Sequence, residues 1–112
     1  MLNQSVIVGR VVREPELNET ESGIKVTNLT LAVPRSYKND EGEYDTDFLN
    51  CTLWRGIAEN ASEYLHKGDL VGVKGRLQSR EIEEDGTNKT VMELVAEKVT
   101  YLTSKKENEL AY

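Results

Sequence analysis

The order of extended and helical patterns restricts the fold of this chain more than any other feature. Only residues 57–67 show helical spacing, through Ile57, Ala61, Tyr64 and Leu65, and Lys67 with Gly68 is expected to end this helix as a basic last turn and a glycine cap. Elsewhere β-branched and alternating apolar residues predict strands bounded by Gly, Pro or polar residues. The predicted strands are residues 5–12, 24–34, 44–54, 70–80 and 90–102.

Three strands, one helix and two strands is the element order of the OB-fold, a five-stranded Greek-key barrel. We therefore expect an all-β protein of this class, with its helix between the third and fourth strands. A chain of 112 residues suits one domain, which we assign to residues 1–104, with a short polar tail at 105–112. Element order alone leaves open other small β-rich folds that carry one helix.

The net charge of −6 is unusual for a nucleic-acid-binding domain. The acidic residues, however, gather in runs at 14–21, 40–47 and 81–85. The last two runs contain Gly and polar residues, and we interpret them as solvated loops. Because the position of charges matters more than their sum, the acidic balance does not exclude a nucleic-acid partner.

The predicted third strand has one apolar face and one unusual face. Side chains alternate along a strand, so Phe48 and Trp54 share a side with Asn50 and Thr52. Exposed aromatic rings are unfavourable on a solvent-facing sheet, so this pattern favours a flat ligand that stacks on them. A subunit contact or a second core would explain the same pattern.

The predicted fourth strand favours the interpretation with a stacking ligand over a subunit contact or a second core. Lys74, Arg76 and Arg80 alternate on one face with Gln78, as a stripe about 20 Å long. Such a stripe is often only a solvated face, but cations that contact phosphates beside aromatics that stack on bases are typical of single-stranded nucleic-acid binding, at roughly 1–3 kcal/mol per stacked base. Further candidate residues for this site are Arg10, Arg35, Lys38, Arg55 and, as a third aromatic platform, Tyr37.

Enzyme and metal sites are not supported. Cys51 falls on the apolar face of its strand, whereas a reactive thiolate needs an exposed electropositive setting. His66 is expected at a helix end on the surface, and one Cys with one His cannot complete a zinc site. We expect no catalysis, metal or cofactor. The single cysteine and the absence of a signal or spanning segment predict a cytoplasmic protein that does not contact membranes.

Over residues 1 to about 103 the chain resembles the bacterial-type single-stranded DNA-binding proteins. The resemblance rests on Asn3, Val6, VGR at 8–10, EPEL at 14–17, LAV at 31–33, DFxNC at 47–51, WRxxAEN at 54–60 and KGDLVGVKGRLQSR at 67–80. It implies an OB-fold, a homotetramer and sequence-independent binding of single-stranded DNA in replication, recombination and repair. It also implies that Tyr37, Phe48 and Trp54 occupy base-stacking positions.

The chain departs from that family's pattern in two places. Ile82 stands in a predicted loop where the family usually has an aromatic stacker, so one platform is expected to be weakened. The sequence ends at Tyr112 without the long linker and acidic tip that recruit partner enzymes in the family, which leaves that role unsupported and is compatible with a short paralogue or a phage- or plasmid-encoded version. An alternative function is an OB-fold accessory subunit that binds a protein partner in a replication-restart complex through the Phe48 and Trp54 face.

Overall fold

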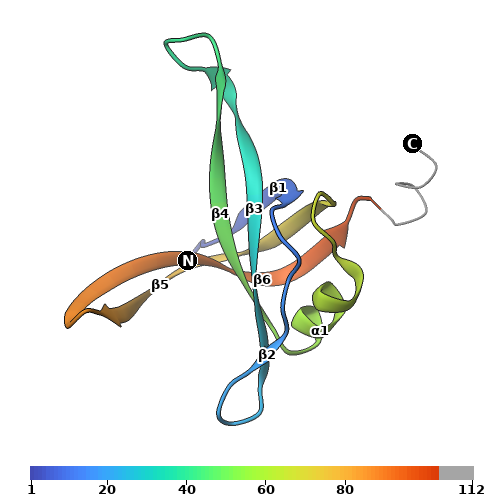
Figure 1. The fold of residues 1–112 in the computed structure, drawn as a ribbon, viewed down its shortest axis with the longest axis vertical. Coiled ribbons are helices and arrows are strands. Elements are labelled where there is room, and N and C mark those ends of the chain that lie inside the picture. Colours follow the sequence, from blue (N-terminus) through green and yellow to red (C-terminus); the bar gives the residue numbers. More distant parts are fainter. Residues whose placement is uncertain (104–112) are drawn as a thin grey trace.

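The computed structural model describes residues 1–103 of the chain (Figure 1). The proposed domain end at residue 104 and the predicted tail at 105–112 lie outside the described residues. The elements are β1 Ser5–Val11, β2 Asn18–Glu19, β3 Lys25–Lys38, β4 Tyr44–Trp54, α1 Arg55–Tyr64, β5 Leu70–Glu84 and β6 Thr87–Tyr101.

Five of these strands form a closed barrel. The sheet order is β1-β5-β6-β4-β3, and β1 returns to β3 through the pairs Arg10–Ala32 and Val11–Leu31. The β4–β6 pairing is parallel and the others are antiparallel. This arrangement, with α1 between β4 and β5, confirms the predicted five-stranded OB-fold. The two-residue strand β2, which pairs with β3, was not predicted.

The core lies where the strands cross inside the barrel. The alternation predicted for β3 and β4 is confirmed, because Leu29, Leu31, Cys51 and Leu53 are all buried. Helix α1 adds Ala58 and Ala61 to the same cluster. Burying a large apolar side chain contributes roughly 1.5–3 kcal/mol. This cluster is therefore the main source of stability for the barrel, and the barrel holds the outer surface in place.

The helix ends earlier than predicted. It stops at Tyr64, Leu65 is already extended, and the last turn carries no basic residue. Leu65 is 1% exposed, so the chain leaves the helix to bury this side chain. Gly68 has a φ of 93° and serves the following turn, in which the backbone N–H of Asp69 donates to the carbonyl of His66 at 3.0 Å. The predicted cap is therefore wrong in position.

Two pairs of strands extend beyond the barrel as hairpins. We call residues 33–48 the β3–β4 arm and residues 76–92 the β5–β6 arm, and Figure 1 shows them projecting in different directions. Neither arm contains a buried residue. The first arm closes through Asn39, whose Oδ1 accepts from the backbone N–H groups of Glu41 and Glu43, and Gly42 takes a φ of 80°, which suits a hairpin turn.

The acidic run 81–85 is not the loop that we predicted. Residues 81–84 are paired with β6, from Glu81–Thr90 to Glu84–Thr87. Only Asp85 and Gly86 turn the chain, with φ values of 53° and 76°. An Asp-Gly pair with two positive φ values is a preferred two-residue hairpin turn, and it carries the strands almost to the tip. Likewise only residues 40–43 of the run 40–47 lie in a loop.

Candidate nucleic-acid interface

The strand register confirms that Phe48 and Trp54 lie on the outer face of β4. Across the strand pair, Phe48 faces Ala32 and Trp54 faces Val26. The two aromatic side chains are 64% and 39% exposed. Neither belongs to the buried cluster, so the possibility of a second core inside the described part of this chain is excluded. Thr52, between them, is buried.

The three predicted stacking residues lie at separate levels of the structure. Trp54 ends β4 at the barrel, and Phe48 lies six residues earlier, or about 20 Å along an extended strand. Tyr37 is 63% exposed and lies near the outer end of β3. The fold thus presents these rings at intervals along β3 and β4 and does not gather them into one cluster.

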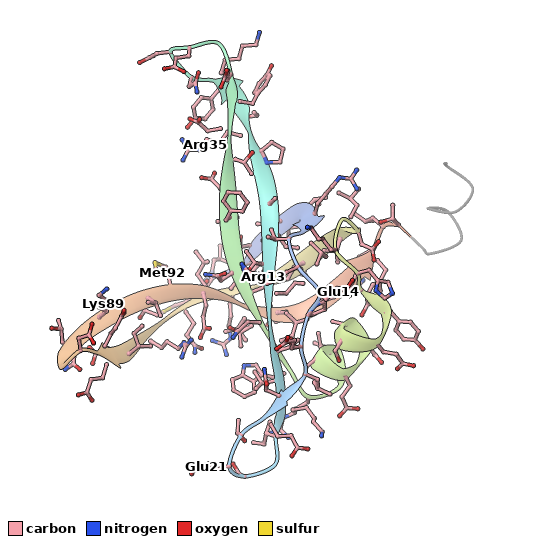
Figure 2. All side chains as sticks on the ribbon, viewed as in Figure 1. Arg13, Glu14, Glu21, Arg35, Lys89 and Met92 are labelled. Atoms are coloured by element: carbon pink, nitrogen blue, oxygen red, sulfur yellow. The ribbon has the colours of Figure 1, made fainter. Side chains whose placement is uncertain are left out.

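The two cations on the β3–β4 arm have partners on the same arm. Arg35, labelled in Figure 2, donates from Nε and Nη2 to the carboxylate of Asp47. Asp45 lies 3.8 Å from Nη1 of the same guanidinium. The hydrogen bonds with Asp47 raise the pKa of Arg35, and those with Arg35 lower the pKa of Asp47. The Lys38 ammonium lies 5.8 Å from the centre of the Tyr44 ring. The sequence pattern alone predicts neither of these pairings.

A polar hollow of about 320 Å³ lies between the barrel face and the β5–β6 arm. Its lining combines two cations, a carboxylate, amides, hydroxyls and apolar side chains. The lining residues are Arg13, Asn28, Thr30, Asn50, Thr52, Arg80, Ile82, Val91, Met92 and Glu93. Figure 2 shows Arg13 close to the place where the arms meet and Met92 along β6. For brevity we call this the inter-arm hollow.

Arg80 is engaged within the inter-arm hollow. Its Nε lies 3.4 Å from Oε1 of Glu93, a carboxylate that is 8% exposed. The hydroxyl of Thr52 donates to the other oxygen, Oε2, of Glu93. A nearly buried carboxylate needs such partners, so Arg80 supplies charge compensation inside the protein as well as a cation at the surface.

The other predicted cations lie outside this hollow. Arg76 donates to the side-chain carbonyl of Gln78 at 2.7 Å, and Arg10 donates to the backbone carbonyl of Gly68 at 3.0 Å. Lys74 is paired with Val6 of β1 and Lys98 of β6. Arg55 begins α1 with a φ of 57°. Because β5 curves around a closed barrel, the stripe expected from simple alternation does not converge on one groove.

Several residues of the hollow were not identified as candidates from sequence. Asn28 and Thr30 alternate with buried Leu29 and Leu31 on β3, so the period-two pattern already contained a signal for them. Arg13 follows β1 in an irregular segment and has no such signal. Its location beside the hollow follows only from the pairing of β1 with β3.

A second hollow, of about 270 Å³, is apolar and lies at the open end of the barrel. It is lined mainly by Ile7, Leu49, Leu77, Met92 and Leu94. Leu77 shares the inward face of β5 with buried Val71 and Val73, yet it is 46% exposed. The barrel opens where the β5–β6 arm departs, which leaves this inward face uncovered.

The residues that could suggest an enzyme, Cys51 and His66, line neither of these hollows. Cys51 is fully buried, and burial raises the pKa of its thiol to about 12. His66 is exposed after α1, with Nδ1 3.1 Å from Oε2 of Glu14. Cys51 and His66 thus do not form a nucleophile and base pair. No helix among residues 1–103 has the length and apolar character needed to cross a membrane.

An OB barrel whose outer strands expose aromatic rings, amides and cations defines a binding protein of the oligonucleotide-binding class. The chain belongs to the single-strand binding protein family, whose model matches residues 2–102. This membership confirms the resemblance found in the sequence and the interpretation as a binding protein without catalysis.

Individual relatives agree with this assignment. The chain is 48% identical over 106 residues to single-stranded DNA-binding protein B of Bacillus subtilis (strain 168), covering 94% of each chain. It is 44% identical over 110 residues to a single-stranded DNA-binding protein of Staphylococcus aureus (strain MRSA252), covering 97% of this chain and 70% of that one. Among solved structures, a Plasmodium falciparum SSB in complex with ssDNA superposes with a TM-score of 0.81 and 26% identity, covering 92% of this chain and 96% of that one.

Proposed function

We propose that this protein binds and protects single-stranded DNA, without base-sequence preference, in replication, recombination and repair. The observation that carries the proposal is the pair of exposed aromatic rings, Phe48 and Trp54, on the polar outer face of β4. Every base has a π-face, so stacking gives affinity that tolerates any sequence. The names of the relatives and the similar structure with bound ssDNA support this function.

In this proposal the aromatic rings bind bases and the cations bind phosphates. Tyr37, Phe48 and Trp54 are the stacking residues. The proposed phosphate contacts are Arg10, Arg35, Lys38, Arg55, Lys74, Arg76 and Arg80. We propose that the protein acts in the cytoplasm.

Quenching of Trp54 fluorescence tests this function directly, because Trp54 is the only tryptophan in the chain. Titration with oligo(dT) should quench the emission, and log K should fall with log salt concentration by about 0.7 for each phosphate contact. An oligonucleotide that neither binds nor quenches at low salt would contradict the proposal. Binding of a protein to this face instead would favour the accessory-subunit alternative.

We also propose that the protein is a homotetramer. The apolar hollow at the barrel mouth and the outer face of β1 support self-association, since Met92, Leu77, Val6 and Val8 are 64%, 46%, 68% and 47% exposed. Apolar surface of this kind is a typical interaction site. Sedimentation equilibrium should give four times the monomer mass of 12.7 kDa, and a monomer at micromolar concentration would contradict the proposal.

A further inference from the structure

The inter-arm hollow has hydrogen-bonding groups between two cations that come from different parts of the chain. Arg13 follows β1, on the side of β3, while Arg80 belongs to β5. Asn28, Thr30 and Asn50 lie between them, and Thr30 donates to Oδ1 of Asn50 at 3.0 Å. That bond occupies an acceptor and leaves the amide N–H groups of Asn50 as donors, which suits an anionic ligand.

The two cations differ in how far the protein already neutralises them. Arg80 faces the nearly buried Glu93 at 3.4 Å, and a phosphate that approaches this pair meets opposite charges of equal size. The Arg13 side chain has no hydrogen bond or ion pair within residues 1–103. A cation without a partner attracts an anion more strongly than one that is compensated.

The acidic residues beside Arg13 leave it free. Glu14 and Glu16 line a neighbouring hollow together with Arg13. The two carboxylate oxygens of Glu14 contact the turn after α1, at Nδ1 of His66 and the backbone N–H of Lys67. Neither carboxylate lies within ion-pair distance of the Arg13 guanidinium, so the nearby negative charges do not hold this side chain.

We infer that the inter-arm hollow is a phosphate-binding subsite in which Arg13 provides the main electrostatic contact and Arg80 a smaller one. The inference rests on the proposed binding of single-stranded DNA and adds to it a residue outside the predicted stripe. The ligand is a backbone phosphate of the strand. The hydrogen-bond donors of Asn50 and its neighbours lie where they can contact the same phosphate or the adjoining sugar.

The test compares the salt dependence of oligo(dT) binding among matched variants. Arg13→Gln should reduce the magnitude of the log K against log salt slope by about 0.7, the value for one lost single-strand phosphate contact. Over a tenfold rise in salt, the variant should lose about fivefold less affinity than the wild type. Arg80→Gln should change the slope less than Arg13→Gln, and Arg13→Lys should retain the wild-type slope because it keeps the charge.

Lys67→Gln is the control for net charge. Lys67 is exposed in the turn after α1 and does not line the inter-arm hollow, so this variant should keep the wild-type slope. A wild-type slope for Arg13→Gln would overturn the subsite, as would equal flattening in Lys67→Gln. Failure of the wild type to bind oligo(dT) would instead reject the proposed function, so the two failures are distinguishable.

Discussion

Arg35 and Asp47 form a bidentate ion pair across the β3–β4 arm, with Nε 3.1 Å from Oδ2 and Nη2 2.9 Å from Oδ1. Both side chains are about 40% exposed. An exposed pair of this kind contributes little to stability. If Arg35 binds a phosphate as proposed, that phosphate must compete with Asp47 for the same planar guanidinium.

Asp47→Asn should therefore strengthen binding to oligo(dT). The change releases Arg35 from its bidentate partner, and the slope of log K against log salt should become steeper by up to about 0.7 if Arg35 gains one phosphate. Salt-dependent fluorescence titration measures this effect. Asp40→Asn, on the loop of the same arm, changes the net charge equally and should leave the slope unchanged. Equal slopes for Asp47→Asn and the wild type would contradict the prediction.

Removal of either exposed ring from β4 should weaken binding without loss of the fold. Trp54→Ala and Phe48→Ala should each cost about 1–3 kcal/mol of binding to oligo(dT), the range for loss of one stacked base. Fluorescence anisotropy of a labelled oligonucleotide measures both variants, since Trp54→Ala removes the intrinsic signal. Both proteins should keep their far-ultraviolet circular dichroism.

Tyr64→Ala is a suitable control for these two variants. Tyr64 is 61% exposed but lies on α1, where its ring packs edge-on against Tyr101 with centroids 6.5 Å apart. Loss of this ring should not change affinity. If Tyr64→Ala weakened binding as much as Trp54→Ala, the assignment of stacking to β4 would be wrong.

Ile82→Trp should tighten binding. Ile82 is half-buried in β5 and lines the inter-arm hollow, and an isoleucine offers a base only apolar contact. A tryptophan there should add about 1 kcal/mol, the low end of a stacking gain. Oligo(dT) affinity and melting temperature should be measured together. A lower melting temperature without a gain in affinity would mean that the larger ring is overpacked and that Ile82 has a structural role.

The buried thiol of Cys51 should make stability depend on alkaline pH. Its pKa is about 12 in the folded protein, against an ordinary value of 9.0 for an exposed thiol. Between these values the unfolded chain has lost the proton while the folded chain keeps it, so stability falls as pH rises. At pH about 10.5 the loss should approach 2 kcal/mol. Denaturant unfolding at pH 8 and 10.5 should show a larger drop for the wild type than for Cys51→Ala, and equal drops would contradict the prediction.

The sequence predicted the barrel because its core depends on local alternation. Leu29 and Leu31 on β3, and Cys51 and Leu53 on β4, follow a period of two that burial preserves. The same pattern placed Phe48 and Trp54 on the outside. Residues 81–84 form strand and not the predicted loop, because the Asp-Gly turn at 85–86 allows both strands to continue despite their acidic side chains.

The partners of the charged residues could not be predicted in the same way. Arg80 meets Glu93 and Thr52 only because β4, β5 and β6 are neighbours in the barrel, and these residues are distant in sequence. Arg35 meets Asp47 only through the pairing of β3 with β4. Alternation identifies the face on which a cation lies, whereas its partner depends on sheet order and register.

The absence of buried residues from both arms separates what this protein can change from what it must keep. The buried cluster lies outside residues 33–48 and 76–92, although Val33 at the base of the β3–β4 arm packs against it, so substitutions or small length changes near the hairpin ends leave its packing intact. Substitutions there can then change how strongly each arm binds single-stranded DNA with little effect on folding. Related chains should therefore differ most in sequence at the two hairpin ends and least at the buried residues of the barrel.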